Sequence, residues 1–172
     1  MCNKPPMPVV QAAGIRGSNF GGWLDSSATD LLNISTNIIK VLYLDRTRAD
    51  GVDGNLCFAS FTDLVTEDWF FNQIKDFQPQ VIHVWGTEYP HSLKVLRAAR
   101  SLGLENSSVV SIQGLVSIYG RYHYAEGMPE HVMRIPSFGD FIRRTTLDRE
   151  RRVFIEKGDA ERECLRLAKH VI

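Results

Sequence analysis

The sequence has no excess of charge of either sign, no long apolar run and no recognisable cysteine pattern. Twenty Lys and Arg balance twenty Asp and Glu in 172 residues, so the net charge favours neither nucleic acid nor an anionic membrane as the main partner. The longest apolar runs fall far short of the ~20 residues of a membrane-spanning helix. The opening MCNKPPMPVV is too polar and too rich in proline for a signal peptide. We therefore expect a cytoplasmic protein.

The chain also lacks the short motifs of several enzyme classes. It contains no phosphate-binding P-loop and no G-x-S-x-G nucleophile turn. The three cysteines, Cys2, Cys57 and Cys164, and the five histidines have no spacing typical of zinc ligands or of a disulfide framework. These absences predict free thiols and no bound metal, and they leave the catalytic residues unassigned.

Apolar runs alternate with helical patterns along most of the chain. The first twenty residues are rich in proline and glycine and predict a loop, with at most a short extended piece at Met7–Gln11. The predicted strands are Ile38–Asp45, Leu56–Phe61, Gln80–Trp85 and Ser107–Gly114, and another begins at the final His-Val-Ile. The predicted helices follow Gly22 and span Glu67–Phe77, Pro90–Leu102 and Thr146–Lys169.

Strands and helices that alternate in this way predict an α/β fold. Parallel strands are buried on both sides, which agrees with apolar runs that are nearly continuous. The expected architecture is a Rossmann-like, doubly wound, mainly parallel sheet with helices on both faces. No strand is predicted before the glycine-rich loop, and the chain ends as a strand begins. The sequence therefore looks truncated at both ends. We expect residues 1–172 to form one domain of a larger fold.

One stretch, DFQPQVIHVWGTEYPHSL (Asp76–Leu93), concentrates hydrogen-bonding residues directly after a buried strand. Because open α/β sheets bind ligands beyond the carboxyl ends of their strands, we expect Thr87, Glu88, Tyr89 and His91 at the rim of a crevice. There a carboxylate at Glu88 can bind sugar hydroxyls, and an imidazole at His91 can transfer a proton. The alternative is that Glu88 only complements the helix dipole and that His91 is solvated.

Two glycine-containing pairs are further candidates for ligand contact. Gly21 and Gly22 can present backbone N–H groups to a diphosphate or a sugar at a helix start, or they form a turn and a cap. Gln113 and Gly114 end a strand at the same rim, where a Gln side chain can both donate to and accept from a sugar hydroxyl. Gly114 would allow close approach of a ligand or an unusual backbone angle. A plain turn is the alternative for this pair.

Three other features have a structural and a functional interpretation. YGRYHY (Tyr119–Tyr124) is either an acceptor platform, with Tyr119 among the contacts, or a loop folded over its own aromatic rings. The arginine-rich IRRTTLDRERRVF predicts a solvated helix face, and contact with an anionic membrane surface is the alternative. His83 alternates with apolar neighbours inside a strand, so a structural role is expected for it.

In their order and spacing, several segments resemble a known family. DFQPQVIHVWGTEYPHSL, VVSIQGLVSIYGRYHY some twenty residues later, and the final AKHVI are similar to the amino-terminal half of retaining GT-B glycosyltransferases. The resemblance is to the large nucleotide-sugar-dependent family 4 type, which includes bacterial capsule and cell-surface polysaccharide enzymes. NFGGW resembles the glycine-rich first loop of that family, which opens onto the cleft between two domains. The resemblance covers the chain from about Asn19 to Ile172.

The resemblance implies an acceptor-side domain, inactive alone, whose carboxyl-terminal donor-binding domain is absent. The complete two-domain protein would be the enzyme, transferring a sugar from a nucleotide-sugar donor to a glycan or lipid-linked acceptor, without a metal or another cofactor. Several family members carry a histidine near the transferred sugar where this chain has Gln113, so a catalytic histidine is not carried over to this position. An apolar face left open by the absent domain predicts self-association. The expected location is cytoplasmic, with a peripheral position at the inner membrane surface as the alternative.

Two other interpretations stay open. The first is a free-standing Rossmann-like module that binds a nucleotide, a sugar or a protein partner without catalysis. The second is a small hydrolase that uses Glu88 and His91, for which the sequence offers no placed nucleophile.

Overall fold

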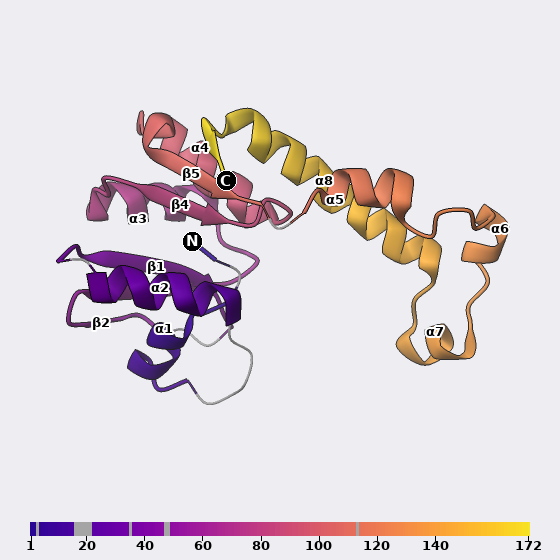
Figure 1. Ribbon diagram of the computed structural model, residues 1–172, viewed down its shortest axis with the longest axis horizontal. Helices are drawn as coiled ribbons and strands as arrows, with labels where there is room; N and C mark the ends of the chain where they lie inside the picture. The colour runs from indigo at the N-terminus through magenta and orange to yellow at the C-terminus, as the bar shows by residue number, and fades with distance from the viewer. Residues whose placement is uncertain (3, 16–21, 35, 47–48, 113) are drawn as a thin grey trace.

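The computed structural model describes residues 1–2, 4–15, 22–34, 36–46, 49–112 and 114–172, and it has a mixed α/β fold (Figure 1). Strands of the described residues form two three-stranded sheets. In the first sheet, β3 (Leu56–Phe61) pairs parallel with β1 (Ile39–Leu44) and antiparallel with β2 (Gly51–Asp53). The predicted α/β class is therefore confirmed, although the strand ladders divide into two sheets where one was expected.

The second sheet is parallel throughout. β5 (Ser108–Ser111) lies between β4 (Ile82–Trp85) and β6 (His170–Val171). In this register Val84 of β4 lies opposite Val110 of β5, and both side chains are fully buried. The final strand begins where the sequence predicts it.

Met1 and Cys2 connect the two sheets through backbone hydrogen bonds. The N–H of Cys2 donates to the carbonyl oxygen of Leu42 in β1 at 2.9 Å. On the other side, the amino group of Met1 donates to the carbonyl oxygen of His83 in β4 at 2.7 Å, and the Met1 carbonyl accepts from the N–H of Trp85 at 3.1 Å. Bonding of one residue to positions two apart on its neighbour is the pattern of parallel pairing. These two residues therefore lie between β1 and β4 as a very short strand would.

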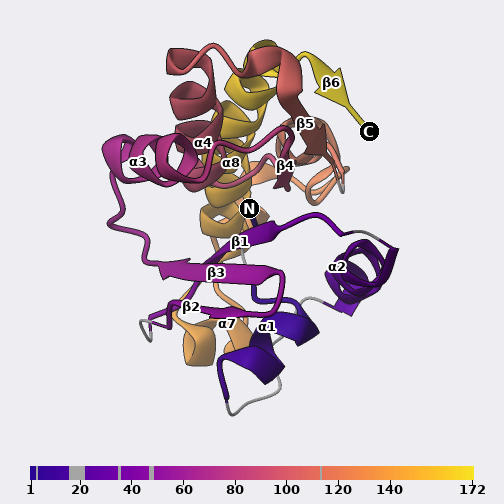
Figure 2. The ribbon, with the colours of Figure 1, turned by 90° about the vertical axis from the view of Figure 1, so that its left-hand side faces the viewer.

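Helices cover both sides of the strands (Figure 2). The helical elements of the described residues are α1 (Met7–Ala12), α2 (Gly22–Ile34), α3 (Glu67–Phe77), α4 (Pro90–Ser101), η1 (Glu105–Ser107), α5 (Val116–Ile118), η2 (Tyr119–His123), α6 (Glu130–Met133), α7 (Phe138–Arg143) and α8 (Leu147–Leu167). Leu42 packs in a buried cluster with residues of α3, α4 and α8, whereas its neighbour Tyr43 packs with Val9 of α1 and Leu32 of α2. Because side chains alternate along a strand, α3, α4 and α8 cover one face and α1 and α2 cover the other.

Local sequence signals explain the helix ends that the sequence predicts well. The Thr66 hydroxyl accepts from the N–H of Trp69 at 3.4 Å and caps α3, and Gln78 ends this helix with a left-handed φ of 51°. Pro90 occupies the first turn of α4, where its missing N–H costs nothing. Gly103, with φ of 71°, follows the end of α4 as predicted.

Two elements differ from the sequence-based prediction. The piece predicted as loop or extended at Met7–Gln11 is the helix α1. Pro8 lies in its first turn, where proline is tolerated, and the N–H of Met7 donates to the Asp25 carboxylate at 2.6 Å. The connection from β1 to β3, for which no strand is predicted, contains β2, a three-residue edge strand. Strand β2 is too short to leave an alternating pattern in the sequence.

The chain between β5 and β6 forms an arm that projects from the strands (Figure 1). Its first part, α5 and η2, packs along α8. Glu161 of α8 is fully buried, and its carboxylate accepts the N–H of Val116 at 2.9 Å, the N–H of Ser117 at 3.1 Å and the Ser117 hydroxyl at 2.5 Å. These bonds satisfy the first N–H groups of α5, which have no partner inside the helix. A side chain of α8 therefore fixes the start of the arm.

Gly158 allows the close approach of α8 to α5. A Cβ atom at Gly158 would lie 2.5 Å from the Cα of Ser117, closer than any side chain tolerates. We expect Gly158→Ala to lower the free energy of unfolding by about 1–3 kcal/mol, the range for overpacking, despite the better helix propensity of Ala. Urea unfolding measures this change. Gly139→Ala in α7 is the control, because the nearest atom to its Cβ would be 3.8 Å away. Equal stability of Gly158→Ala and the unchanged chain would contradict this packing.

Candidate functional site

Hydrogen bonds at Gly86 hold the start of the connection from β4 to α4. Its N–H donates to the carbonyl oxygen of Ser111 at 3.0 Å, and its carbonyl accepts from the hydroxyl of Ser92 at 2.7 Å. Gly86 has φ of 87°, a left-handed conformation that favours glycine. A Cβ atom here would also lie 3.1 Å from Oε2 of Glu88. The loop of Gly86–Tyr89 therefore begins at a fixed turn on the carboxyl end of β4.

His91 is buried in the first turn of α4, so the interpretation of a solvated His91 is wrong. Its ring stacks on Tyr89, with ring centroids 5.1 Å apart and planes 8° apart. The edge of Phe61, at the end of β3, approaches it from another side at 5.1 Å. Burial lowers the pKa of His91 to about 4, and the nearby Asp63 opposes this shift only in part. At neutral pH the imidazole is therefore uncharged and can donate or accept one hydrogen bond at Nε2.

Two buried polar atoms without a hydrogen-bond partner lie in this loop and in the helical turn that follows it. Among the described residues, the buried side-chain atoms with no hydrogen-bond partner are Oγ1 of Thr87, Nε2 of His91 and Oε2 of Glu105. Two of these three come from the segment where the sequence predicts ligand contact. An unpaired buried polar group costs about 1–3 kcal/mol. The free protein therefore carries an energetic cost at this loop, which a ligand or a bound water would relieve.

The remaining residues of the predicted rim vary in exposure. Glu88 and Tyr89 are half-buried, and Lys157 of α8 places its ammonium 5.6 Å from the centre of the Tyr89 ring. Gly114 is exposed, with open space around its Cβ position. The loop thus has an accessible carboxylate beside a covered hydroxyl and imidazole.

The glycine pair of the first loop is only partly described. Gly22 is the first residue of α2, as the prediction of a helix start requires. Gly21 and Gln113, both candidates for ligand contact, lie outside the described residues. Ligand contact by these residues stays a prediction.

Tyr119 belongs to a cluster of aromatic rings on the arm. Its ring contacts Tyr124 at 5.7 Å and Phe154 of α8 at 5.3 Å, both nearly perpendicular. The hydroxyl of Tyr124 donates to the Glu150 carboxylate at 2.6 Å. This agrees with the interpretation of a segment folded over its own aromatic rings, and an acceptor platform at Tyr119 stays a prediction.

His83 has the structural role expected from the sequence. Its Nε2 lies 2.7 Å from the hydroxyl of Ser111, and its ring contacts Trp85 edge-to-face at 4.7 Å. Phe61 and Lys157, by contrast, are contacts of the loop that the sequence analysis missed. Both come from elements distant in the chain, and the only local signal is that Phe61 ends a buried strand.

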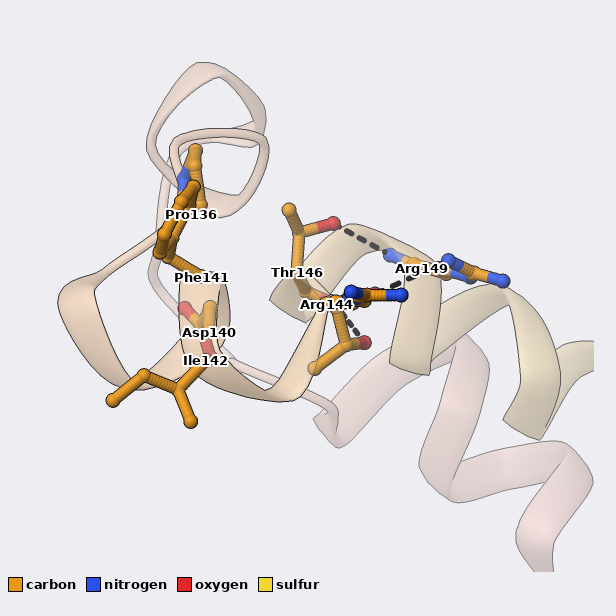
Figure 3. A pocket seen from close by; sticks show the side chains of 8 residues that line it. Pro136, Asp140, Phe141, Ile142, Arg144, Thr146 and Arg149 are labelled. Carbon is orange, nitrogen blue, oxygen red and sulfur yellow. Dashed lines mark hydrogen bonds between the residues drawn. The ribbon is translucent and has the colours of Figure 1, made fainter.

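The arm carries a separate hollow (Figure 3). This cavity of about 540 Å³ lies between α7 and the start of α8 and is lined by Pro136, Asp140, Phe141, Ile142, Arg144, Thr145, Thr146 and Arg149. Phe141 and Ile142 expose 75% and 67% of their surface. In the arginine-rich segment Arg144, Arg149 and Arg152 are exposed, whereas Arg151 is half-buried and donates to the carbonyl oxygen of Gly120 at 3.2 Å. The predicted solvated helix face is therefore confirmed only in part. Contact of this segment with a membrane stays a prediction.

Among the described residues there is neither a candidate metal-binding group nor a candidate membrane-spanning helix. The His, Cys, Asp and Glu side chains of these residues form no group of three that could hold a metal ion. No helix in the described ranges is both long and apolar enough to cross a membrane.

Comparisons with known proteins identify no relative of this chain. No protein-family model, curated protein or solved structure matches this chain.

The pKa of His91 predicts an acid-sensitive stability. Because its pKa falls from 6.5 when unfolded to about 4 when folded, the unfolded chain binds more protons between these values. The contribution of His91 is complete above pH 6.5 and is lost as the pH falls through 4. His83, whose pKa burial also lowers to about 4, acts in the same direction. In urea unfolding at pH 7 and pH 4.5, His91→Phe should lose less stability on acidification than the unchanged chain.

The same variant tests the unpaired Nε2. Phe keeps the ring contacts and removes a buried polar atom, so His91→Phe should gain about 1 kcal/mol of stability at pH 7. The matched control is Ile135→Phe, since Ile135 is exposed and carries no ionisable group, so its substitution should leave the pH dependence unchanged. A His91→Phe chain with the acid sensitivity of the unchanged chain would rule out His91 as its source.

Proposed function

We propose that this chain is the acceptor-side domain of a glycosyltransferase, which binds a glycan or lipid-linked sugar and is inactive alone. In the complete two-domain protein, a second domain would hold the nucleotide-sugar donor. The observation that carries the proposal is the pair of unpaired buried polar atoms, on Thr87 and His91, directly after a parallel strand. The resemblance of the surrounding segments to GT-B enzymes points in the same direction.

A doubly wound fold is part of the proposal. Counting Met1–Cys2 as a strand, the hydrogen bonds give the order β2, β3, β1, Met1–Cys2, β4, β5, β6. From Met1–Cys2 the chain moves outward through β1 to β3 and then returns to the other side through β4, β5 and β6. With helices on both faces, this order agrees with one Rossmann-like sheet, whose order reverses between Met1–Cys2 and β4.

The point of reversal supports the position of the site. Ligands of open α/β sheets bind beyond the carboxyl ends of the strands where the strand order reverses. The loop of Gly86–Tyr89 follows the carboxyl end of β4, next to that point. Thr87, Glu88 and His91 are therefore the acceptor contacts that we propose, with Gly114 beside them after β5.

The chemistry of the loop suits a polyol. The half-buried Glu88 carboxylate can accept from sugar hydroxyls, and the Thr87 hydroxyl and the uncharged His91 imidazole can each donate or accept. Because the last two are covered in the free protein, a sugar reaches them only when the loop beyond Gly86 shifts. Hydrogen bonds from the sugar to Oγ1 of Thr87 and Nε2 of His91 would remove the free-energy cost of burying these atoms without partners. This gain would favour the bound state.

In the complete enzyme, an acceptor hydroxyl would attack the anomeric carbon of the donor sugar, and the nucleotide diphosphate would leave. Holding the acceptor in line and excluding water lowers the barrier to such a transfer. In this proposal the role of this chain in the reaction is to bind and orient the acceptor. A free-standing binding module without catalysis is the alternative, and binding of a nucleotide by this chain alone would favour it.

Calorimetry with simple glycans and nucleotide-sugars tests the proposal. We expect glycan binding without nucleotide-sugar binding. Thr87→Val should weaken glycan binding about 5- to 10-fold, the loss of one hydrogen bond of about 1 kcal/mol, while the free protein is as stable as before or more stable. Glu88→Gln should also weaken it.

The matched control is Thr87→Ser, which keeps the hydroxyl and should bind glycan nearly as well as the unchanged chain. Glycan binding that is the same in Thr87→Val and Thr87→Ser would remove Thr87 from the site. Tight nucleotide-sugar binding by this chain would contradict the proposed division between the two domains.

A further inference from the structure

A second cavity lies between β1 and β4, at the ends of these strands opposite to the loop of Gly86–Tyr89. It has a volume of about 440 Å³. Its walls are residues 37–42 at and before β1, residues 81–83 and Trp85 at β4, side chains of α2, α3 and α4, and the pair Met1–Cys2 at its inner end. We call this cavity the strand slot.

Backbone groups on both sides of the strand slot point toward it. The N–H of Ile39 donates to Asn55 and that of Asp45 to Phe61, so the odd-numbered residues of β1 face β3. The alternate residues, Lys40 and Leu42, therefore direct their N–H and C=O groups toward the slot.

The same alternation holds on β4. The N–H of Gly86 donates to Ser111 of β5, and that of Trp85 donates to Met1. Peptide groups at His83 and Val81 consequently face the slot as well. The slot is thus bounded by two strand edges that run in the same direction.

The side-chain lining of the slot is mainly apolar, and its polar members are Asn37, Lys40, Gln73 and His83. Ile38 and Val81 each expose 65% of their surface at its mouth. Ile74 and Phe77 of α3 lie on one face, and Ala28 of α2 lies on the other. A strand buried on both faces carries apolar residues at successive positions. The slot would accept such a strand.

The inner end of the slot is the nitrogen of Met1. It is buried and donates to the carbonyl oxygen of His83, as a peptide N–H of a parallel strand would. Burial lowers the pKa of this amino group, because a charge there is poorly solvated. An uncharged peptide nitrogen in the same place would keep the hydrogen bond without that cost.

We propose that the strand slot is a docking site for one extended apolar peptide strand, which runs parallel to β1 and β4 and ends at the nitrogen of Met1. Met1 lies opposite Leu42, since Cys2 pairs with Tyr43. Continuing this register places about four residues of the peptide between Ile38–Val41 and Gln80–His83. The docked strand would bond to both edges and make the two sheets continuous over the length of β1.

The probe is a four-residue peptide fused to Met1, which delivers the strand at high effective concentration. Two fusions of the whole chain are compared, Ile-Val-Ile-Val and Gly-Ser-Gly-Ser. Both replace the terminal amino group by an amide, so only the side chains and strand propensity differ. We expect the apolar fusion to melt about 5 °C or more above the polar one. The amides of Lys40, Leu42 and His83 should exchange with deuterium more slowly in the apolar fusion.

Substitution of one wall residue completes the test. Val81→Asp should remove most of the gain of the apolar fusion and leave the unextended chain nearly unchanged, because Val81 is largely exposed there. Val52→Asp is the matched control, since Val52 is 72% exposed on β2, away from the slot. Equal melting temperatures of the two fusions, with unaltered exchange at Lys40, Leu42 and His83, would overturn the proposal. The slot and the loop of Gly86–Tyr89 lie at opposite strand ends, so failure here leaves the proposed function untouched.

Discussion

The arrangement of this protein depends on the few backbone hydrogen bonds that Met1 and Cys2 make to β1 on one side and to β4 on the other. Without them the sheet of β1, β2 and β3 and the sheet of β4, β5 and β6 share no strand pairing. The clusters of α3, α4 and α8 on one face and of α1 and α2 on the other extend over both sheets, which this link aligns. It also sets the carboxyl ends of β1, β3 and β4 at one edge.

At that common edge, two buried polar atoms lie in a closely packed environment. Gly86 fixes the turn after β4, Ser92 holds the Gly86 carbonyl, and Phe61 and Tyr89 enclose the His91 ring. Inside this well-packed frame two polar atoms remain without partners. Buried polar groups in folded proteins nearly always have partners, and each exception calls for an explanation such as a catalytic role, an ordered water or a bound ligand. An uncharged imidazole and a hydroxyl in such a setting suit recognition of hydroxyl groups more than acid catalysis.

The sequence predicts those parts whose signals are local. Leu56–Phe61 and Glu67–Phe77 form the expected strand and helix, because the apolar and aromatic run of the strand and the Thr66 cap and apolar spacing of the helix are local signals. Helix α1 was missed because prolines favour both loops and helix starts, and the contact that decides between them, from Met7 to Asp25, is distant in the chain. Likewise, the position of His91 follows from the sequence, whereas its burial depends on Phe61, a residue of another strand.

The most direct test of the proposed site is an NMR titration of the ¹⁵N-labelled chain with glycan acceptors, following every assigned backbone amide. The account predicts that the largest shifts occur at Gly86–Ser92 and at Gly114, with smaller changes at the end of β3. The amides around the cavity of α7 and α8 should stay unchanged. Shifts confined to that cavity, with the loop after β4 unaffected at saturation, would contradict a sugar site at the carboxyl edge of the strands.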